Sequence, residues 1–472
     1  MPEFDFLIRG GQIIDGTGAA RRSADIGIHD DRIIAVGNLD NTHSRRVIDA
    51  TNLVVSPGFI DVHNHSDAWL LREANFAPKT RQGFTTEILM ADGISYAPVN
   101  PDTAHDWIFY LRALNGLRVD QYESWKRLID YAELLDCRTA QNFLLHIPYA
   151  NVRTMHCGFG RAAVDDFQMR GIQADIARGM EQGAVGLSTG LDYIGQCFAT
   201  TDELATVCEA MQPYGGIYVT HVRYKSGLMK AVREAVEIGR RAGVPVHISH
   251  LKAATSEAVD EMLEYIDESA RHEVDFSFDV YPYQPGSTML SYLLPYDFWV
   301  DGPLAAMGKL ADPKLRRRFR DGLRAYRLHL DRISIAWLPG EENRRHLGST
   351  LADYVAQSGQ QEEDALCNLL IEERLAVLCV MNEGDDELVR PFLQHDLFMM
   401  GSDGIYHPES KVHPRVCGSA PRLLGPCVRD WRLFSLEEAV AKMTSKPARR
   451  FGIRERGELK EGYFADLVIF DP

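Results

Sequence analysis

The chain has 472 residues, of which 45% are hydrophobic and 25% charged, a composition typical of a globular protein with a large core and more than one domain. Its formal net charge of −16 argues against nucleic acid or an anionic membrane surface as a partner, because both select basic proteins. The sequence contains no apolar run of about 18 residues, no export signal and no C-x-x-C pair among its eight cysteines, so we expect a cytoplasmic protein with reduced thiols and no membrane span.

Residues 1–56 are predicted to form short strands joined by glycine and aspartate turns, with two of the strands at 24–28 and 32–37. The end of the chain, residues 451–472, returns to the same pattern, with a strand expected at 465–470. Such strands are typical of a small β-sandwich. We therefore expect the last strands to pair with the first ones in one small domain formed by both termini.

An apolar run at residues 54–62 ends in two histidines one residue apart, His63 and His65. In an extended strand, side chains at positions i and i+2 point to the same side, so the two imidazoles are presented together. Imidazole is a common ligand of zinc and similar metals, although such a pair can also line a polar pocket.

Three later apolar runs also end in residues that can bind a metal, namely His221, His250 and Asp403. A helical pattern at residues 229–242 separates the first two, and alternating strands and helices predict parallel βαβ units. In a parallel barrel the carboxyl ends of the strands gather at one face, which is where such enzymes work. These ends, with the His-x-His pair, are expected to converge on a metal, whereas His247 is interpreted as a packed histidine.

Residues 57–450 are predicted to form a long α/β section built of parallel βαβ units. Polar helical sequence interrupts it at residues 285–345, which we interpret as an inserted subdomain beside the active-site face. The basic run at 313–320 is expected to be a solvated helix face rather than a nucleic-acid contact. The β-sandwich of residues 1–56 and 451–472 completes the predicted architecture.

The most specific motifs are spread along the chain in this order: Pro57–His65, Gly183–Leu191, Thr220–Arg223, Ile248–Lys252, Asp279–Tyr283, Gly286–Thr288, Gly401–Gly404, His413–Arg415 and Ala465–Val468. Together they resemble the amidohydrolase superfamily and, within it, the N-acyl-D-amino-acid deacylase (D-aminoacylase) family. The resemblance covers nearly the whole chain. It implies a TIM-like (β/α)8 barrel with a small β-sandwich and metal-assisted hydrolysis of an amide.

The resemblance also implies one or two divalent metals, Zn²⁺ or else Mn²⁺ or Co²⁺. Asp92, His221 and His250 resemble the family's tight metal site, and the His-x-His pair resembles its second site, with Asp403 beside it. Asp403 is the expected general base, taking a proton from the activated water and returning it to the leaving amine. The expected ligands are therefore His63, His65, Asp92, His221, His250 and Asp403.

Three departures from the family pattern stand out. Asp92 occupies the place of the usual metal-binding cysteine, which would retain the site with a harder ligand and favour two metal positions or a metal other than zinc. No lysine ends a strand suited to the bridging carbamylated lysine of many superfamily members, so Asp92 is expected to take that role. Lys225 stands where an acidic residue is common, which could alter substrate choice. The tail after Phe470 is short for the family.

The expected substrate is a small molecule with an α-carboxylate. The resemblance assigns its binding to Tyr193, Lys252, Tyr283 and Ser287, with the ammonium as countercharge and the hydroxyls as directed donors. The alternative is that Tyr281 and Tyr283 are packed aromatic residues.

The activity implied by the resemblance is cleavage of an N-acyl-D-amino acid to a carboxylate and a free D-amino acid. Two alternatives remain open. One is a cyclic-amide hydrolase, similar to hydantoinase or dihydroorotase, and the other is a non-catalytic relative that kept the fold. The sequence predicts no oligomeric state.

Overall fold

The computed structural model of the chain describes residues 4–325 and 329–472. Its centre is an eight-stranded parallel sheet in the order β16-β12-β11-β10-β9-β8-β7-β6. The sheet closes where β6 meets β16, since Val62 N donates to Met400 O at 3.4 Å and Asp403 N donates to His63 O at 2.7 Å. The strands are β6 (Phe59–Asp61), β7 (Phe84–Leu89), β8 (Asn142–Pro148), β9 (Gly186–Gly190), β10 (Ile217–His221), β11 (Val246–Ile248), β12 (Phe276–Val280) and β16 (Phe398–Met400). The predicted TIM-like barrel is confirmed.

Amphipathic helices cover the outside of the barrel. In α8 (Leu228–Ala242), the buried Ala231, Val232, Ala235 and Val236 recur at helical spacing, and Gly243 ends the helix at a positive φ of 65°. The other helices of this region are α1 (Asp67–Arg72), α2 (Ala77–Thr80), α3 (Ala104–Tyr110), α4 (Leu128–Leu135), α5 (Tyr149–Cys157), α6 (Asp166–Glu181), α7 (Thr201–Cys208), α9 (Ser256–Tyr265), α10 (Arg271–Glu273), α15 (Arg390–Gln394), α16 (Arg415–Arg422), α17 (Leu436–Met443) and α18 (Ser445–Arg450). Among the described residues, no helix is both long and apolar enough to cross a membrane.

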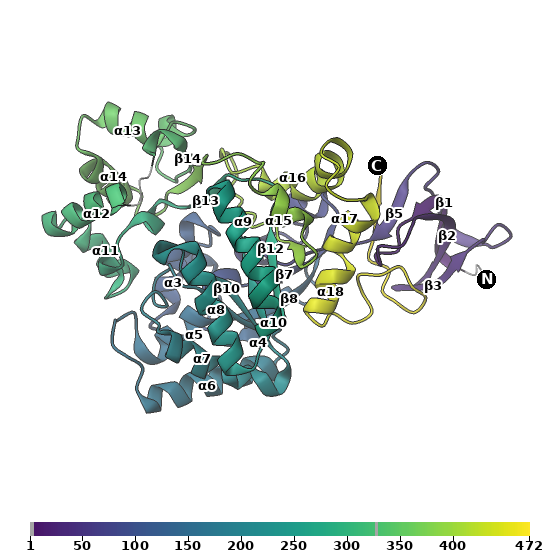
Figure 1. Cartoon of the computed structure of the whole chain (residues 1–472), viewed down its shortest axis with the longest axis horizontal. Helices are drawn as coiled ribbons and strands as arrows, with labels where there is room; N and C mark the ends of the chain where they lie inside the picture. The colour runs from purple at the N-terminus through teal and green to yellow at the C-terminus, as the bar shows by residue number, and fades with distance from the viewer. Residues whose placement is uncertain (1–3, 326–328) are drawn as a thin grey trace.

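Both termini build a second sheet at one end of the molecule (Figure 1). Its order is β17-β5-β1-β2-β3, with β4 paired to β1. The first half of β1 pairs with β4 and the second half with β5, so one continuous sheet bends around its own core, which includes Ile8, Ile26 and Val55. The expected contribution of both termini is confirmed. The strands are β1 (Phe4–Ile13), β2 (Arg22–His29), β3 (Arg32–Gly37), β4 (Ser44–Asp49), β5 (Val54–Pro57) and β17 (Leu467–Phe470).

An inserted subdomain occupies the opposite end of the molecule (Figure 1). It lies between β12 and α15, in the described part of residues 281–389, a longer stretch than the expected 285–345, and its three-stranded antiparallel sheet has the order β13-β15-β14. The elements are β13 (Gly286–Met289), β14 (Ile333–Trp337), β15 (Leu378–Met381), α11 (Pro303–Lys309), α12 (Pro313–Ala325), α13 (Leu351–Ser358) and α14 (Glu362–Glu372).

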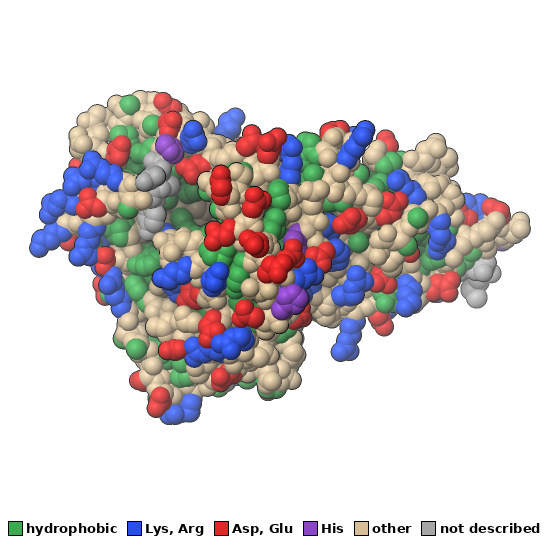
Figure 2. All heavy atoms as spheres, viewed as in Figure 1, with side chains coloured by type: hydrophobic (Ala, Val, Ile, Leu, Met, Phe, Trp, Pro, Cys, Tyr) green, Lys and Arg blue, Asp and Glu red, His purple; other side chains and the backbone are tan. Residues whose placement is uncertain are grey.

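The basic run of the sequence lies on α12. Figure 2 shows blue side chains gathered at this end of the molecule. Arg316 pairs with Asp364 at 2.8 Å, and Arg320 pairs with Glu363 at 3.3 Å, both acids belonging to α14. These arginines therefore join two helices of the subdomain.

Candidate metal centre

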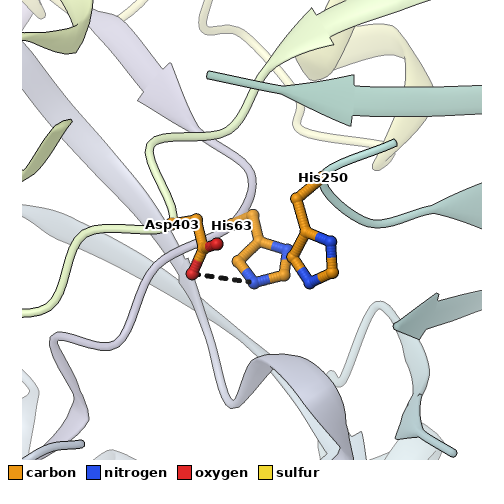
Figure 3. A group of neighbouring side chains, drawn as sticks. All are labelled: His63, His250 and Asp403. Atoms are coloured by element: carbon orange, nitrogen blue, oxygen red, sulfur yellow. Dashed lines mark ion pairs between the residues drawn. The ribbon is translucent and has the colours of Figure 1, made fainter. Parts of the chain in front are cut away.

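The predicted ligand side chains meet at the carboxyl ends of the barrel strands. His63 and His65 follow β6, and His221 ends β10 with its Nδ1 3.0 Å from Nε2 of His250. Figure 3 shows His63, His250 and Asp403 facing one another from three different strand ends. The structure thus brings together His63, His65, Asp92, His221, His250 and Asp403.

Asp92 belongs to two groups of three residues that could each hold a metal ion. The ligand atoms of Asp92, His63 and His65 lie within 4.8 Å of one another, as do those of Asp92, His221 and His250. Oδ1 of Asp92 lies 3.5 Å from Nε2 of His63 and 3.8 Å from Nε2 of His250. Its other oxygen, Oδ2, lies 3.6 Å from Nε2 of His65. The carboxylate therefore faces both triads, which a bridging ligand requires.

The charge balance of this cluster fits bound cations. Both ring nitrogens of His63, Nε2 of His221 and Oδ1 of Asp92 are buried without a hydrogen-bond partner, which is uncommon for buried polar atoms. Burial alone would lower the pKa of His63, but the carboxylates of Asp92, Asp279 and Asp403 raise it to about 10. Imidazole and carboxylate donors suit zinc and other divalent transition metals. The residues therefore fit one or two such metals.

Strand β9 shapes the turn that carries Asp92. Asp92 has a φ of 58°. Ser188 Oγ donates to Met90 O at 2.6 Å and accepts from Gly93 N at 3.1 Å. A Cβ at Gly190 would lie only 2.4 Å from Asp92 O, so a larger residue would displace the turn. The Gly-Leu-Ser-Thr-Gly motif of the sequence is thus the support of the Asp92 carboxylate.

Asp403 presents one oxygen to the cluster and the other to a buried arginine. Its Oδ2 lies 2.7 Å from Nη1 of Arg415. Its Oδ1 lies 3.2 Å from Nε2 of His65 and 3.8 Å from Nε2 of His63 (Figure 3). Burial raises the pKa of Asp403, but Arg415 and the neighbouring histidines outweigh it and hold that pKa well below its usual range. These charges favour the ionised carboxylate of Asp403, whose Oδ1 faces the histidines of the cluster.

A fully buried network holds the loop of Asp403. Nζ of Lys79 lies 2.5 Å from Asp61 Oδ2 and also donates to Ser402 Oγ. Ser402 donates from Oγ to Asp61 Oδ2 at 2.6 Å and from its backbone N to Asp61 Oδ1 at 2.8 Å. Glu87 Oε2 lies 4.0 Å from the same ammonium. Because Asp61 precedes the His-x-His pair, this network joins the turn that carries His63 and His65 to the loop that carries Asp403.

Asp279, in β12, is a site residue that the sequence analysis missed. Its Oδ2 lies 3.0 Å from Nε2 of His247 and 3.6 Å from Nδ1 of His63, and its Oδ1 accepts from His250 N at 2.9 Å. A carboxylate behind a ligand histidine fixes the orientation of the ring. The other ring nitrogen of His247 lies 2.8 Å from Ser277 Oγ, so His247 is packed and hydrogen-bonded. The sequence signal was an aspartate in a buried strand that also holds Phe276, Phe278 and Val280.

A cavity of about 580 Å³ lies beside the cluster. Three of the four predicted substrate-binding residues, Tyr193, Lys252 and Ser287, line it. The hydroxyl of Tyr193 lies 3.3 Å from Thr288 Oγ1. The hydroxyl of Ser287 donates to Cys379 O at 2.8 Å, so it is engaged by the backbone of β15.

Tyr283, the fourth predicted residue, is not part of this lining, and its hydroxyl donates to Gly418 O at 3.2 Å. Its neighbour Tyr281 does line the cavity. Nζ of Lys252 lies 3.4 Å from the centre of the Tyr281 ring, and the guanidinium of Arg415 lies 4.4 Å from it. Tyr281 therefore packs against two cations of the cavity, the buried Arg415 and the half-buried Lys252.

Arg415 also escaped the sequence analysis, which included it only as the last residue of a motif. It lines the cavity, and in addition to Asp403 it contacts Ser287 O, to which Nη2 donates at 2.9 Å. Its burial, its ion pair with the predicted base and its place in the cavity lining make Arg415 a candidate site residue.

Lys225, one of the departures from the family pattern, lies behind the cavity wall. Its Nζ donates to Tyr292 O at 2.7 Å and to Leu294 O at 3.4 Å. Burial lowers the pKa of Lys225 to about 8. Asp192 accepts from its backbone N at 3.3 Å and lies 3.6 Å from Nε2 of His221. This pair therefore ties the inserted subdomain to a ligand histidine.

Comparison with known proteins gives consistent results. A model described as the amidohydrolase family matches residues 390–472. The D-aminoacylase of Alcaligenes xylosoxydans xylosoxydans is 35% identical, over 99% of this chain and 88% of the relative. The crystal structure of N-acyl-D-glutamate deacylase from Bordetella bronchiseptica, in complex with zinc and a phosphonate mimic of the tetrahedral intermediate, superposes with a TM-score of 0.83 at 32% identity, covering 99% of this chain and 90% of that one. A D-aminoacylase whose binuclear metal centre was studied gives a TM-score of 0.81 at 33% identity, with the same coverage.

The structural similarity extends over both the barrel and the terminal sheet, because nearly the whole chain is covered in each comparison. The family assignment drawn from the motifs is confirmed by this identity and coverage. The chain belongs to the D-aminoacylase family of amidohydrolases.

Proposed function

We propose that the protein hydrolyses the amide bond of N-acyl-D-amino acids, using one or two divalent metals held by the cluster around Asp92. The observation that carries the proposal is the carboxylate shared by two triads of buried ligands beside a cavity of about 580 Å³. The D-aminoacylase and deacylase relatives support the same reaction. When bound, such a metal acts as a Lewis acid that polarises the amide carbonyl and makes hydroxide available near neutral pH.

The residues of the chain divide the remaining work. Oδ1 of Asp403 accepts the proton of the attacking water and returns it to the leaving nitrogen, because this oxygen faces the ligands while Oδ2 stays paired with Arg415. Lys252 attracts the α-carboxylate of the substrate. Two of its three N–H donors are used by Gln284 O at 3.1 Å and Pro285 O at 3.2 Å, which leaves one for the substrate.

A substrate screen tests this function. The purified protein is assayed with N-acetyl-D- and N-acetyl-L-amino acids after addition of Zn²⁺, Mn²⁺ or Co²⁺, and free amine is measured. We expect release from the D-series alone. Turnover of hydantoins in place of these substrates would favour a cyclic-amide hydrolase. No turnover together with less than 0.2 metal per chain after reconstitution, a threshold set at roughly a fifth of one full site, would favour a non-catalytic relative.

Metal content tests the role of Asp92. Asp92→Ala removes the shared ligand, so metal content and activity are expected to fall together, while Asp92→Cys keeps a single anionic ligand and retains part of both. Asp102→Asn, at an exposed turn, is the matched control and is expected to keep its metal. An Asp92→Ala protein that binds metal normally, measured by elemental analysis, would exclude Asp92 as a ligand and direct attention to Glu87.

We also propose a cytoplasmic location. All eight cysteines are free thiols, including the exposed Cys137 and Cys417. Free thiols in a chain of this size are typical of a reducing compartment. Fractionation of the native host, with detection of the protein in the cytoplasmic fraction, tests this.

A further inference from the structure

Much of the cavity wall is made of aromatic rings and aliphatic carbon, and two of the rings pack on histidines of the cluster, Tyr193 on His221 with 4.8 Å between ring centres and Tyr224 on His250 with 5.8 Å. Leu114, Tyr193, Tyr224, Tyr292 and Met381 all contribute to it. The tyrosine hydroxyls are already engaged by the protein, for example that of Tyr292, which donates to a buried carboxylate at 3.1 Å. The rings therefore present their faces rather than free hydroxyl groups to a substrate. Such a surface is suited to apolar groups.

Two cations line the inner part of the cavity, the buried Arg415 and the half-buried Lys252. The charge of Arg415 is paired with Asp403 at 2.7 Å, and Lys252 is the countercharge of the α-carboxylate in the proposed function. Lys225 is not part of the lining, because it lies behind Tyr292. Arg332 lines the mouth but is exposed, so solvent and salt screen its charge. Of the lysines and arginines described in the lining, Arg415 is thus paired with Asp403 although its Nε keeps no hydrogen-bond partner, Lys252 is assigned to the α-carboxylate, and Arg332 is exposed.

Glu383 adds a negative charge to the same cavity. It follows β15 and lines the cavity. Its Oε1 is buried without a hydrogen-bond partner, and no described residue forms an ion pair with this carboxylate. A negatively charged group entering the cavity would meet this half-buried carboxylate, and like charges repel.

We propose that the cavity selects N-acyl-D-amino acids with uncharged, apolar side chains, and that Glu383 is a specificity-determining residue that rejects acidic ones. This inference rests on the proposed function and specifies its substrate class. The relatives divide between a D-aminoacylase and deacylases for D-glutamate and D-aspartate, so similarity alone does not decide between neutral and acidic side chains.

Isosteric substrates isolate the charge. The metal-loaded enzyme is assayed with N-acetyl-D-glutamine and N-acetyl-D-glutamate, which differ by one charge at nearly the same volume, and with N-acetyl-D-leucine and N-acetyl-D-phenylalanine. We expect kcat/KM for the glutamine compound to exceed that for the glutamate compound at least about tenfold, a modest effect for a half-buried like-charge contact, and the two apolar substrates to exceed both. A kcat/KM for the glutamate compound equal to or above that for the glutamine compound would overturn the proposal.

Two variants test the residue. Glu383→Gln is expected to narrow the glutamine-to-glutamate ratio severalfold, mainly by raising kcat/KM for the glutamate compound. Glu387→Gln is the matched control, because Glu387 is exposed, lies outside the cavity and pairs with Arg390 at 3.5 Å; it should leave the ratio as it is. An unchanged ratio in Glu383→Gln would remove Glu383 from the proposal.

Binding separates this inference from the proposed function. The Kd values of the two isosteric compounds are measured by calorimetry with the Asp403→Asn variant, which is expected to bind without turnover. A preference for the glutamine compound in Kd supports the selectivity even where no N-acyl-D-amino acid is hydrolysed, in which case only the proposed reaction fails. A preference for the glutamate compound in Kd refutes the selectivity, whether or not the reaction occurs.

Discussion

Replacing Asp403 distinguishes a catalytic base from a structural partner of Arg415. In Asp403→Asn the proton acceptor is lost, and we expect kcat to fall by about 10²-fold or more. The amide oxygen can still accept from Arg415, and asparagine tolerates the φ of 47° at this position, so the fold should be largely kept. Asp403→Ala removes both the base and the partner of a buried guanidinium. Loss of one partner of such a pair costs about 3–5 kcal/mol, so this variant should be inactive and also clearly less stable.

The two variants are compared by kcat from amine release, by thermal unfolding and by elemental analysis of the metal. Metal held by Asp92, His221 and His250 should be retained in Asp403→Asn, because Asp403 is not a member of that group. Asp102→Asn serves again as the exposed control. An Asp403→Asn protein that folds, keeps its metal and loses less than about tenfold in kcat would show that Asp403 acts only through its ion pair and that the base lies elsewhere.

Two predictions concern the buried network below the site. Lys79→Met leaves the acidic side chains of Asp61 and Glu87 without their cation. We expect the free energy of unfolding, measured with a denaturant, to fall by about 3–5 kcal/mol, and kcat to fall as well. A loss below about 1 kcal/mol, roughly the value of an exposed ion pair, would contradict this prediction. Burial raises the pKa of Glu87 to about 7, although Lys79 opposes this. The native state therefore binds the proton more tightly than the unfolded state, and the stability that Glu87 contributes is fully present below about pH 4.5 and lost as the pH rises through about 7. In Glu87→Gln, the slope of unfolding free energy against pH should be flatter in that window by up to about 1.4 kcal/mol per pH unit. The measurement uses protein from which metal has been removed with a chelator. An unchanged slope would assign the pH dependence to other groups.

The sequence predicts which residues meet in the candidate metal cluster better than it predicts the lining of the cavity, because the two are built differently. His63, His221, His250 and Asp403 each follow an apolar strand, and parallel strands in a barrel must bring their ends together. A local pattern therefore determines a distant contact. The family resemblance added Asp92, which follows β7 in a turn that no periodicity marks.

The pocket depends on contacts that no local pattern contains. Tyr281 and Tyr283 differ by two positions and would lie on the same side of a strand, yet only Tyr281 lines the cavity, because the chain leaves β12 and turns after it. Arg415 reaches Asp403 across a loop of eleven residues, and Glu383 enters from the inserted subdomain. These positions are set by how the subdomain packs on the barrel face.

The backbone of the site shows what this arrangement costs. Asp92, His250 and Asp403 have φ values of 58°, 38° and 47°, a region that residues other than glycine seldom adopt. Such conformations cost of order 1–3 kcal/mol each and persist only where the surroundings determine them. For Asp92, the carbonyl accepts from Gln196 Nε2 at 2.8 Å, and for His250 the backbone N donates to Asp279 at 2.9 Å.

For Asp403, the backbone N donates to His63 O at 2.7 Å, and the preceding Ser402 is held by Lys79 and Asp61. Each strained residue is thus fixed by a hydrogen bond with a different segment of the barrel face, so the side chains of the cluster are in position without a bound metal or substrate. A substitution that displaces one of these turns, for example a larger residue at Gly190, would move the Asp92 carboxylate although Asp92 itself is unchanged. The contacts that hold these strained residues come from different segments, and what they share is that they direct three side chains toward one point. This convergence is the physical reason for assigning that point as the candidate catalytic centre.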